Sequence, residues 1–295
     1  MRLWVIVNPA AGSGKAARSA PGYIRCLQKN GLEVEVSFSN YPGHVYRLIS
    51  EWRGPSSCDG IVAIGGDGTL FEILNALMRR FGEIRVPLGQ IPVGTGNSLS
   101  RDLHPDGAAS AIAAISALRR RRIDLIEYET EAGKAYFANM MGIGFVSDIN
   151  ARSFRYKAIG KLAYALSVVL ETARLRTART TIRLDGREWC LESLFVEICN
   201  SRYTAGNMLL APMAVLDDGQ LDLLLCRPMS AFRLLRVFPK VFRGSHLGLP
   251  EVETLRGREG EIVMDPPRRL SPDGEVIGMT PVRFRCMPAG VEVFA

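Results

Sequence analysis

Three glycine-rich turns, each directly after a short apolar run, place the strongest constraint on how the first part of this chain can fold. The turns span residues 8–15, 65–69 and 92–98. Each preceding run has the length and composition of a buried strand, and helical periodicity follows the turns. Strand–helix alternation of this kind predicts a parallel sheet covered by helices on both faces.

The rhythm changes after about residue 123, which predicts a second domain of different class. Short period-two runs follow, with Asp-Gly turn signals between them and helical stretches at 158–176 and 230–242. This pattern is typical of an antiparallel β-sandwich. We expect an α/β domain over residues 1–126 and a β-sandwich domain over 127–295, whose last strands return to the first domain. The expected strands of the second part are 123–128, 134–140, 180–184, 193–199, 220–226, 261–264, 282–286 and 291–294.

Composition excludes several classes of protein. Of 295 residues, 47% are apolar and 23% charged, which excludes a disordered or fibrous chain. The net charge is +7, and 31 Arg stand beside only six Lys, a bias that suits bidentate contacts with phosphate or carboxylate. Six scattered cysteines and three histidines favour neither a zinc site nor a disulfide framework, so we expect a cytoplasmic protein.

Phosphate binding is the chemistry that the glycine-rich turns suggest, because bare backbone N–H groups before a helix attract anions. In the first turn, Pro9 and Ala16 break a Walker A pattern, whereas Gly12-x-Gly14-x-x-Ala17 matches the dinucleotide pattern or an ordinary strand–helix turn. In the second turn, Asp67 suits a water or magnesium ion beside a phosphate, or a helix cap. Because all three turns end strands of one sheet, we expect them to converge on one crevice.

The motifs together resemble the catalytic domain of the diacylglycerol kinase family, which includes sphingosine and ceramide kinases and soluble bacterial lipid kinases. The resemblance rests on the Asn8-Pro9 turn, GGDGT at 65–69 and PVGTGN at 92–97. It continues in residues 139–145, in 214–222, which resemble the family's metal-binding hairpin, and in 273–275, which resemble its catalytic DGE. GGDGT alone is shared with NAD kinases and phosphofructokinase-like folds.

The resemblance implies a three-layer α/β nucleotide-binding domain, a β-sandwich domain and an active site between them. Mg²⁺ is then held by the Asp218 carboxylate and the carbonyls of Val215 and Gln220. Glu275 is the expected proton acceptor with Asp273 as its partner, although the reverse order of roles stays open; without the family, both motifs read as plain turns. The implied nucleotide-binding residues are Asn8, Pro9, Ala10, Ala11, Gly12, Ser39, Gly65, Gly66, Asp67, Gly68, Thr69, Thr95 and Asn97.

One position departs from the family pattern. Diacylglycerol kinases usually carry Asp after the Asn of the third motif, where this chain has Ser98. That Asp joins a network linking the position of Asp67 to the catalytic acid in bacterial members. Sphingosine kinases also have a small residue there, so the sequence leaves the acceptor open among diacylglycerol, a sphingoid base and a phosphatidylglycerol-like lipid.

The resemblance predicts an ATP- and Mg²⁺-dependent kinase that transfers the γ-phosphoryl group to a hydroxyl of a membrane lipid. Two alternatives are an NAD-kinase-like phosphotransferase with a soluble acceptor and a non-catalytic nucleotide- or lipid-binding module. We expect peripheral association with the cytosolic leaflet and no nucleic-acid partner. The sequence leaves open whether the chain forms a homodimer.

Two basic stretches bear on membrane contact. Residues 152–187 hold nine Lys/Arg against two acids, and 158–175 read as a basic amphipathic helix, whose apolar face belongs either to a core or to a bilayer surface. Four consecutive arginines, 119–122, are expected to end a helix where the dipole favours cations.

Overall fold

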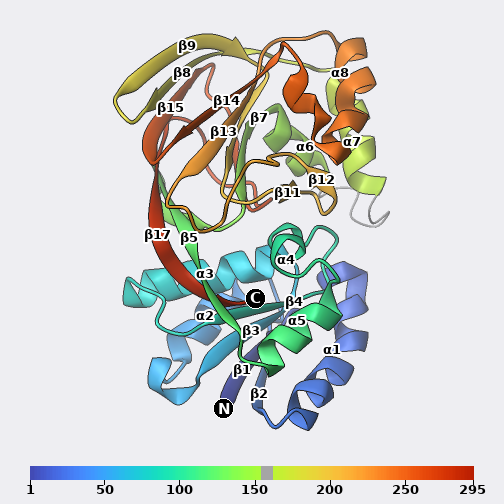
Figure 1. The fold of residues 1–295 in the computed structure, drawn as a ribbon, viewed down its shortest axis with the longest axis vertical. Coiled ribbons are helices and arrows are strands. Elements are labelled where there is room, and N and C mark those ends of the chain that lie inside the picture. The colour runs from blue at the N-terminus through green and yellow to red at the C-terminus, as the bar shows by residue number, and fades with distance from the viewer. Residues whose placement is uncertain (154–161) are drawn as a thin grey trace. The chain divides into compact units, whose positions relative to one another are not determined.

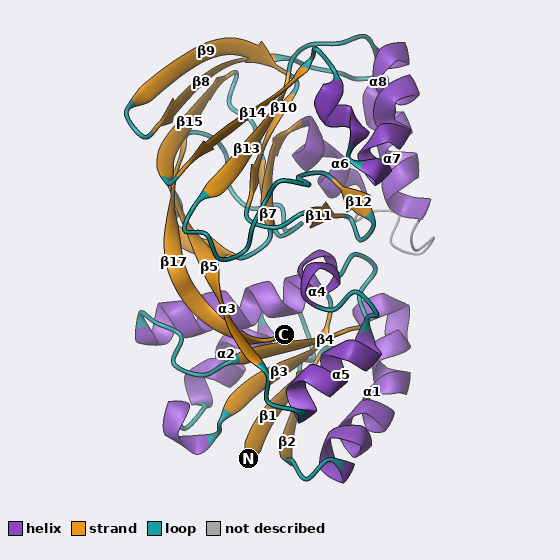
Figure 2. Cartoon of the chain, in the orientation of Figure 1, coloured by secondary structure: helices purple, strands orange, loops and turns teal. Residues whose placement is uncertain are grey.

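The computed structural model describes residues 1–153 and 162–295, with the backbone alone for 162–165. The chain divides into two compact units, one of residues 1–123 with 289–295 and the other of 124–288 (Figure 1). Figure 2 shows that helices and strands alternate in the first unit, whereas strands dominate the second.

The helices and strands of the first unit follow one another as the sequence pattern predicts. They are β1 (Arg2–Val7), α1 (Ala11–Lys29), β2 (Glu33–Phe38), α2 (His44–Glu51), η1 (Pro55–Ser57), β3 (Gly60–Gly65), α3 (Asp67–Phe81), β4 (Leu88–Pro92), α4 (Ser98–Leu103) and α5 (Ala108–Ser116). Two strands, β5 (Arg120–Thr130) and β17 (Val282–Phe294), pass from one unit to the other.

The remaining elements belong to the second unit. They are β6 (Gly133–Phe137), β7 (Met140–Gly144), α6 (Phe145–Ser153), α7 (Leu162–Thr172), β8 (Ala178–Leu184), β9 (Arg187–Ser193), β10 (Phe195–Cys199), β11 (Tyr203–Thr204), β12 (Met208–Leu209), β13 (Leu221–Cys226), α8 (Ala231–Val237), η3 (Phe238–Arg243), η4 (Ser245–Gly248), β14 (Val252–Gly257), β15 (Glu259–Asp265) and β16 (Leu270–Pro272).

The first unit is a parallel sheet between two helical layers. Its strand order is β2-β1-β3-β4, and the end of β17 joins beside β4. Alternation along β1 sends Leu3 to a core shared with α1 and α5. On the other face, Trp4 stacks on Trp52, which meets Phe81 of α3 edge to face. The predicted parallel sheet with both faces covered is therefore confirmed.

The second unit contains two antiparallel sheets. One has the order β14-β13-β10-β7-β16, and the other contains β17, β15, β8 and β9, with β5 and β6 beside β17. Strands β7 and β13 are buried along their whole length, and β10 is buried except for the partly exposed Phe195. At one end of β10, Phe195 packs against a cluster that includes Ile149 of α6, Val168 of α7 and Leu234 of α8. The predicted fold class, an α/β domain followed by an antiparallel sandwich, is confirmed.

Turn chemistry explains the hairpin between β8 and β9. Asp185 and Gly186 both have positive φ, 47° and 78°, which a two-residue hairpin turn between right-twisted strands requires. The Asp185 carboxylate also accepts the backbone N–H groups of Arg258 and Glu259. This Asp-Gly signal was correctly assigned to a turn.

Several expectations about single elements were wrong. Arg119–122 do not end a helix, because α5 stops at Ser116 and Arg120 begins β5, where it pairs with Glu292. The single run 134–140 is two strands, β6 and β7, and the two runs 282–286 and 291–294 are one strand, β17. The region 214–222 is a turn before β13 with no described strand pairing on its other side, so it is not a hairpin.

The helix expected at 158–176 falls partly outside the described residues. Residues 158–161 lie outside them, as do the cations Arg155, Lys157 and Lys161, and α7 occupies 162–172. Across the described ranges, no helix has the combination of length and hydropathy that crossing a bilayer requires.

Phe294 tests whether the C-terminal segment is part of the first unit's core. Its ring is fully buried and lies against the backbone positions of Gly60 and Gly89, which have no side chains to compete with it. We expect Phe294→Ala to lower the free energy of unfolding by about 3–5 kcal/mol, measured by urea titration. The control Phe38→Ala removes a half-exposed ring, and we expect a change of about 0.5 kcal/mol. Equal effects of the two changes would contradict this placement.

Candidate functional site

The three glycine-rich turns of the first unit lie at the carboxyl ends of β1, β3 and β4 and are joined by backbone hydrogen bonds. Asn8 N–H donates to the Ile64 carbonyl at 3.0 Å, and Val93 N–H donates to the Gly65 carbonyl at 3.0 Å. The Asn8 amide also donates to Thr69 Oγ1 at 3.1 Å. Each turn is therefore held by the next one along the sheet edge, which is where open α/β sheets bind ligands.

The second and third turns approach so closely that only glycine fits at their contact. A Cβ on Gly94 would lie 2.5 Å from the Gly66 Cα, and a Cβ on Gly12 would lie 2.2 Å from the Val93 carbonyl oxygen. Both distances are far inside van der Waals contact. The glycines therefore bring three backbones together and leave their N–H groups uncovered by side chains.

The first turn has an unusual backbone. Gly12, Ser13 and Gly14 all have positive φ, between 55° and 83°, at the start of α1. Before them, Asn8 closes the turn, because its side-chain oxygen accepts the Ala10 N–H at 3.1 Å and its carbonyl accepts the Ala11 N–H at 3.1 Å. A left-handed stretch next to a helix N-terminus orients successive N–H groups as an anion-binding concavity.

Asp67 is the one acidic side chain among these turns. The residue is half-buried, with its Oδ1 atom out of contact with water. Loss of water raises the pKa of its carboxyl above the ordinary value, opposed by the hydrogen bond from Ser98 N–H, 2.9 Å from Oδ2. Its second oxygen, Oδ1, has no hydrogen-bond partner within the described ranges. A buried acceptor without a partner calls for a donor, such as a water or a ligand hydroxyl.

The structure brings the predicted nucleotide-binding residues to one edge of the sheet. Ser39 lies at the end of β2, where its N–H donates to the Val7 carbonyl at 2.8 Å. Thr95 is exposed in the third turn, and the Asn97 amide donates to the Gly94 carbonyl at 2.6 Å. The complete set at this edge is Asn8, Pro9, Ala10, Ala11, Gly12, Ser39, Gly65, Gly66, Asp67, Gly68, Thr69, Thr95 and Asn97.

In the second unit, Asp273 follows β16 in a turn with positive φ at Asp273 and Gly274. Its carboxylate accepts three backbone N–H groups, those of Ala138, Asn139 and Met140, at 3.0–3.2 Å. Its own N–H donates to the Met140 carbonyl at 2.8 Å. These hydrogen bonds fix the turn. They also engage the Asp273 carboxylate with the segment that leads into β7.

Asp218, the predicted metal ligand, lies in the turn before β13. Its Oδ1 accepts the Gln220 N–H at 3.0 Å, its Oδ2 pairs with Arg256, and the next residue, Gly219, donates to Asp124 Oδ2 at 2.6 Å. The described residues hold no cluster of three metal-binding side chains. The predicted ligands, this carboxylate with the carbonyls of Val215 and Gln220, would supply oxygen atoms alone, the donor type that a hard cation such as Mg²⁺ prefers.

Sequence reasoning missed two buried acids, Glu197 and Asp222. It also missed the residue that holds the turn containing Asp218. Asp124, at the start of the second unit, holds the turn through Gly219. Glu197 is buried in β10 opposite Gly142, where a Cβ would lie 3.0 Å from both Glu197 Oε2 and Ser271 Oγ. Asp222, on the neighbouring strand β13, is also buried. An acid inside an otherwise apolar run, as in FVEIC at 195–199, was the signal available in the sequence.

Burial changes the titration of both acids in this sheet. Loss of water raises the pKa of Glu197 to about 8 and that of Asp222 to about 6. The Oε2 atom of Glu197 has no partner in the described part of the chain, so nothing there offsets the cost of a negative charge. Glu197 is consequently protonated at neutral pH.

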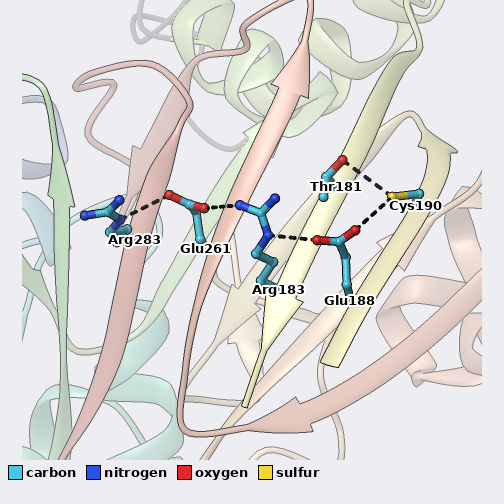
Figure 3. Close-up of polar contacts among 6 residues, drawn as sticks. All are labelled: Thr181, Arg183, Glu188, Cys190, Glu261 and Arg283. Carbon is cyan, nitrogen blue, oxygen red and sulfur yellow. Dashed lines mark hydrogen bonds and ion pairs between the residues drawn. The ribbon is translucent and has the colours of Figure 1, made fainter. Parts of the chain in front are cut away.

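A hollow of about 510 Å³ lies on the sheet of the second unit that contains β8, β15 and β17. The charged side chains that line it pair with one another. Arg183 pairs with Glu188 at 2.8 Å and with Glu261 at 2.7 Å, and Arg283 pairs with Glu261 at 3.1 Å (Figure 3). Arg285 pairs in the same way with Glu127 at 3.0 Å. With its cations already engaged by carboxylates, the hollow offers no free charge to a phosphate ligand.

The buried acid Glu197 predicts a dependence of stability on pH. The folded-state pKa of about 8 exceeds the ordinary 4.5, so the folded protein loses stability as pH rises from about 4.5 through 8. Glu197→Gln has no charge to bury, so its advantage in unfolding free energy over the native protein should grow to a few kcal/mol above pH 8. Urea titrations at pH 5 and 8.5 measure this. The exposed control Glu131→Gln should show no such growth, and a constant difference for Glu197→Gln would contradict the assignment.

Comparisons with known proteins agree with this arrangement. The diacylglycerol kinase catalytic domain model matches residues 2–128, and the YegS C-terminal NAD kinase beta sandwich-like domain model matches residues 140–295. A diacylglycerol kinase of Mycobacterium tuberculosis (strain H37Rv) is 29% identical over 99% of this chain and 94% of its own length. One from Staphylococcus aureus (strain MRSA252) is 27% identical over 100% and 92%.

Solved structures share the fold. A crystal structure from Bacillus anthracis str. Sterne superposes with a TM-score of 0.81 at 26% identity, covering 99% of this chain and 96% of that one. A diacylglycerol kinase structure from the same organism has a TM-score of 0.75 at 22% identity, with the same coverage. Family models covering both units, with relatives matching end to end, make this chain a member of the diacylglycerol kinase family of lipid kinases.

Proposed function

We propose that this protein transfers the γ-phosphoryl group of ATP, with Mg²⁺, to the free hydroxyl of diacylglycerol. The observation that carries the proposal is the locked contact of three glycine-rich turns around Asp67 in a chain that matches diacylglycerol kinases from end to end. Phosphoryl transfer needs positioned phosphates and a base near the attacking hydroxyl more than covalent chemistry by the protein.

The first unit binds the nucleotide. Backbone N–H groups of residues 12–13 and 66–68, at the starts of α1 and α3, receive phosphate oxygens. Ser39 and Thr95 supply hydroxyls at the same sheet edge. Asp67 Oδ1, the buried acceptor, accepts a hydrogen bond from a water or from a ribose hydroxyl. Each of these contacts orients ATP without forming a covalent bond to it.

Glu275 takes the proton of the attacking lipid hydroxyl, and Asp273 holds the turn that positions Glu275. Asp273 already accepts three backbone N–H groups, so its lone pairs hold the turn. Glu275 comes two residues later and its N–H donates to the Pro272 carbonyl at 2.8 Å, which ties its backbone to the same turn. These contacts support Glu275, rather than Asp273, as the proton acceptor.

Asp218 and the carbonyls of Val215 and Gln220 would hold the Mg²⁺. When bound, the ion supplies positive charge that offsets the negative charge developing on the transferred phosphate. Arg256 pairs with Asp218 in the structure, so this guanidinium competes with the ion for the same carboxylate oxygen.

Diacylglycerol is the acceptor that the relatives' names support. In this chain the Ser98 N–H, rather than a carboxylate at that position, reaches Asp67. Because diacylglycerol resides in a bilayer, the protein works at a membrane surface. No observation favours a soluble acceptor or a purely binding role.

A labelling experiment tests the proposal. Purified protein with γ-labelled ATP and Mg²⁺ is given diacylglycerol, sphingosine, phosphatidylglycerol or NAD, each in detergent micelles. We expect label in phosphatidic acid, and a decrease in kcat of about a hundredfold or more for Glu275→Gln, with the KM for ATP unchanged. Label in NAD, or in none of the lipids, would refute the proposal.

Asp273 and Asp185 form a matched pair that separates function from folding. Both occupy Asp-Gly turns with φ near 48°, and both carboxylates accept backbone N–H groups. Asp273→Asn and Asp185→Asn should therefore lower the melting temperature by similar amounts, since an amide accepts fewer of these bonds. Only Asp273→Asn should lower kcat, by tenfold or more on the scale of a lost positioning contact. Equal kcat values in the two variants would remove Asp273 from the active site.

A further inference from the structure

The segment formed by α8 and η3 exposes an apolar stripe beside a basic one. Residues 231–243 run continuously through both helices. Phe232, Leu235, Pro239 and Phe242 are exposed at spacings of three, four and three, which places them on one face. Leu234 and Val237 point the other way and are buried. The segment is therefore anchored by one face and presents large apolar side chains on another.

Each exposed apolar residue of this stripe is followed in the sequence by a Lys or Arg. These cations are Arg233, Arg236, Lys240 and Arg243, again at spacings of three, four and three. Arg233 is paired with Glu251 at 2.6 Å, whereas the other three have no carboxylate partner in the ranges that the structure describes. Between residues 227 and 250 the sequence contains no Asp or Glu.

The contrast with the hollow on the other sheet shows that these cations are not ordinary surface charges. There, Arg183 and Arg283 share Glu261, and Arg183 also meets Glu188 (Figure 3). On α8 and η3 the unpaired cations instead flank rings such as Phe232, whose residue is 76% exposed. Exposing several large apolar side chains to water is unfavourable, and contiguous exposed apolar surface of this kind marks an interaction site.

We propose that this surface (Phe232, Leu235, Phe242, Arg236, Lys240 and Arg243) docks the enzyme on an anionic lipid bilayer. Helices that lie in the membrane interface combine an apolar face with flanking Lys and Arg, whose charges meet lipid phosphates. The neighbouring helix α7, in contact with α8, adds exposed Leu166 and Val169 (Figure 1). The inference rests on the proposed function in that a bilayer holds the acceptor, and it assigns the contact to one surface.

Charge selects the bilayer over a second copy of the chain. A two-fold interface would use the same patch on both copies and bring two sets of unpaired cations together. An anionic bilayer supplies the opposite charge over a flat surface of any extent. Apolar side chains then enter the acyl boundary while the cations remain at the headgroups.

Vesicle sedimentation of the full-length protein tests the surface without ATP. The vesicles are an equal mixture of phosphatidylcholine and phosphatidylglycerol. Each cation near an anionic surface contributes roughly a fivefold factor, so Arg236→Gln/Lys240→Gln/Arg243→Gln should weaken binding about a hundredfold. The control Arg25→Gln/Arg79→Gln/Arg187→Gln removes three exposed cations elsewhere and should weaken it far less.

A matched apolar pair isolates insertion from charge. Leu235 and Phe242 are 39% and 49% exposed, and Leu118 and Phe38 are 38% and 51% exposed on the first unit. Leu235→Ser/Phe242→Ser should weaken vesicle binding roughly a hundredfold, and Leu118→Ser/Phe38→Ser should leave it within about twofold. Thermal unfolding checks that all variants fold. Equal losses in the two pairs, or no binding of the native protein, would overturn the proposal.

Two further measurements separate the possible failures. The Leu235→Ser/Phe242→Ser variant should phosphorylate a short-chain diacylglycerol in detergent micelles at the native rate and lose activity on vesicles. Vesicle binding through the patch without kinase activity on any lipid would refute the proposed function and leave the docking surface intact. Sedimentation velocity without vesicles that shows a dimer broken by the same variant would assign the patch to a second copy and overturn the membrane proposal.

Discussion

The candidate nucleotide site depends on the contact between backbones at Gly66 and Gly94, reinforced by Gly12 against the Val93 carbonyl. A Cβ at Gly94 or Gly12 would lie within 2.5 Å of the neighbouring backbone and would force the turns apart, and a Cβ at Gly66 would already be tight at 3.2 Å from the Gly94 Cα. Because the contact joins main chains, the shape of the site depends little on side-chain rotamers. Asn8, Thr69 and Ser98 then add hydrogen bonds across the same contact.

Carboxylates serve different purposes in this protein according to what surrounds them. Asp67 and Glu197 each have a buried oxygen that lacks a partner in the described residues, and loss of water raises the pKa of both. Asp273 and Asp185 are held by backbone N–H groups and shape turns. Glu261 and Glu188 neutralise arginines on the surface. The unpaired cations of α8 and η3 differ from all of these, which is why they point to a partner outside the chain.

Local patterns were good predictors where one interaction decided the structure. The three glycine-rich turns and the Asp185-Gly186 hairpin followed from backbone preferences that depend on few neighbours. Prediction was poorer where the local sequence was compatible with two different secondary structures. Arg120 begins β5 because a strand ladder with β17 competes with the end of α5, and β6 and β7 are separate strands because residues 138–139 serve the Asp273 turn and the Asn200 amide.

What the sequence by itself determined was the fold class, the family and the positions of the glycine turns, since each depends on periodicity or on residues that no other type can replace. Only the tertiary structure decided that Asp273 is occupied by three N–H groups, that Arg256 pairs with Asp218, and that Glu197 is buried without compensation. It also decided that Phe232, Leu235 and Phe242 face water rather than a core. These outcomes depend on which segments, distant along the chain, lie beside one another, and side-chain type alone does not contain that information.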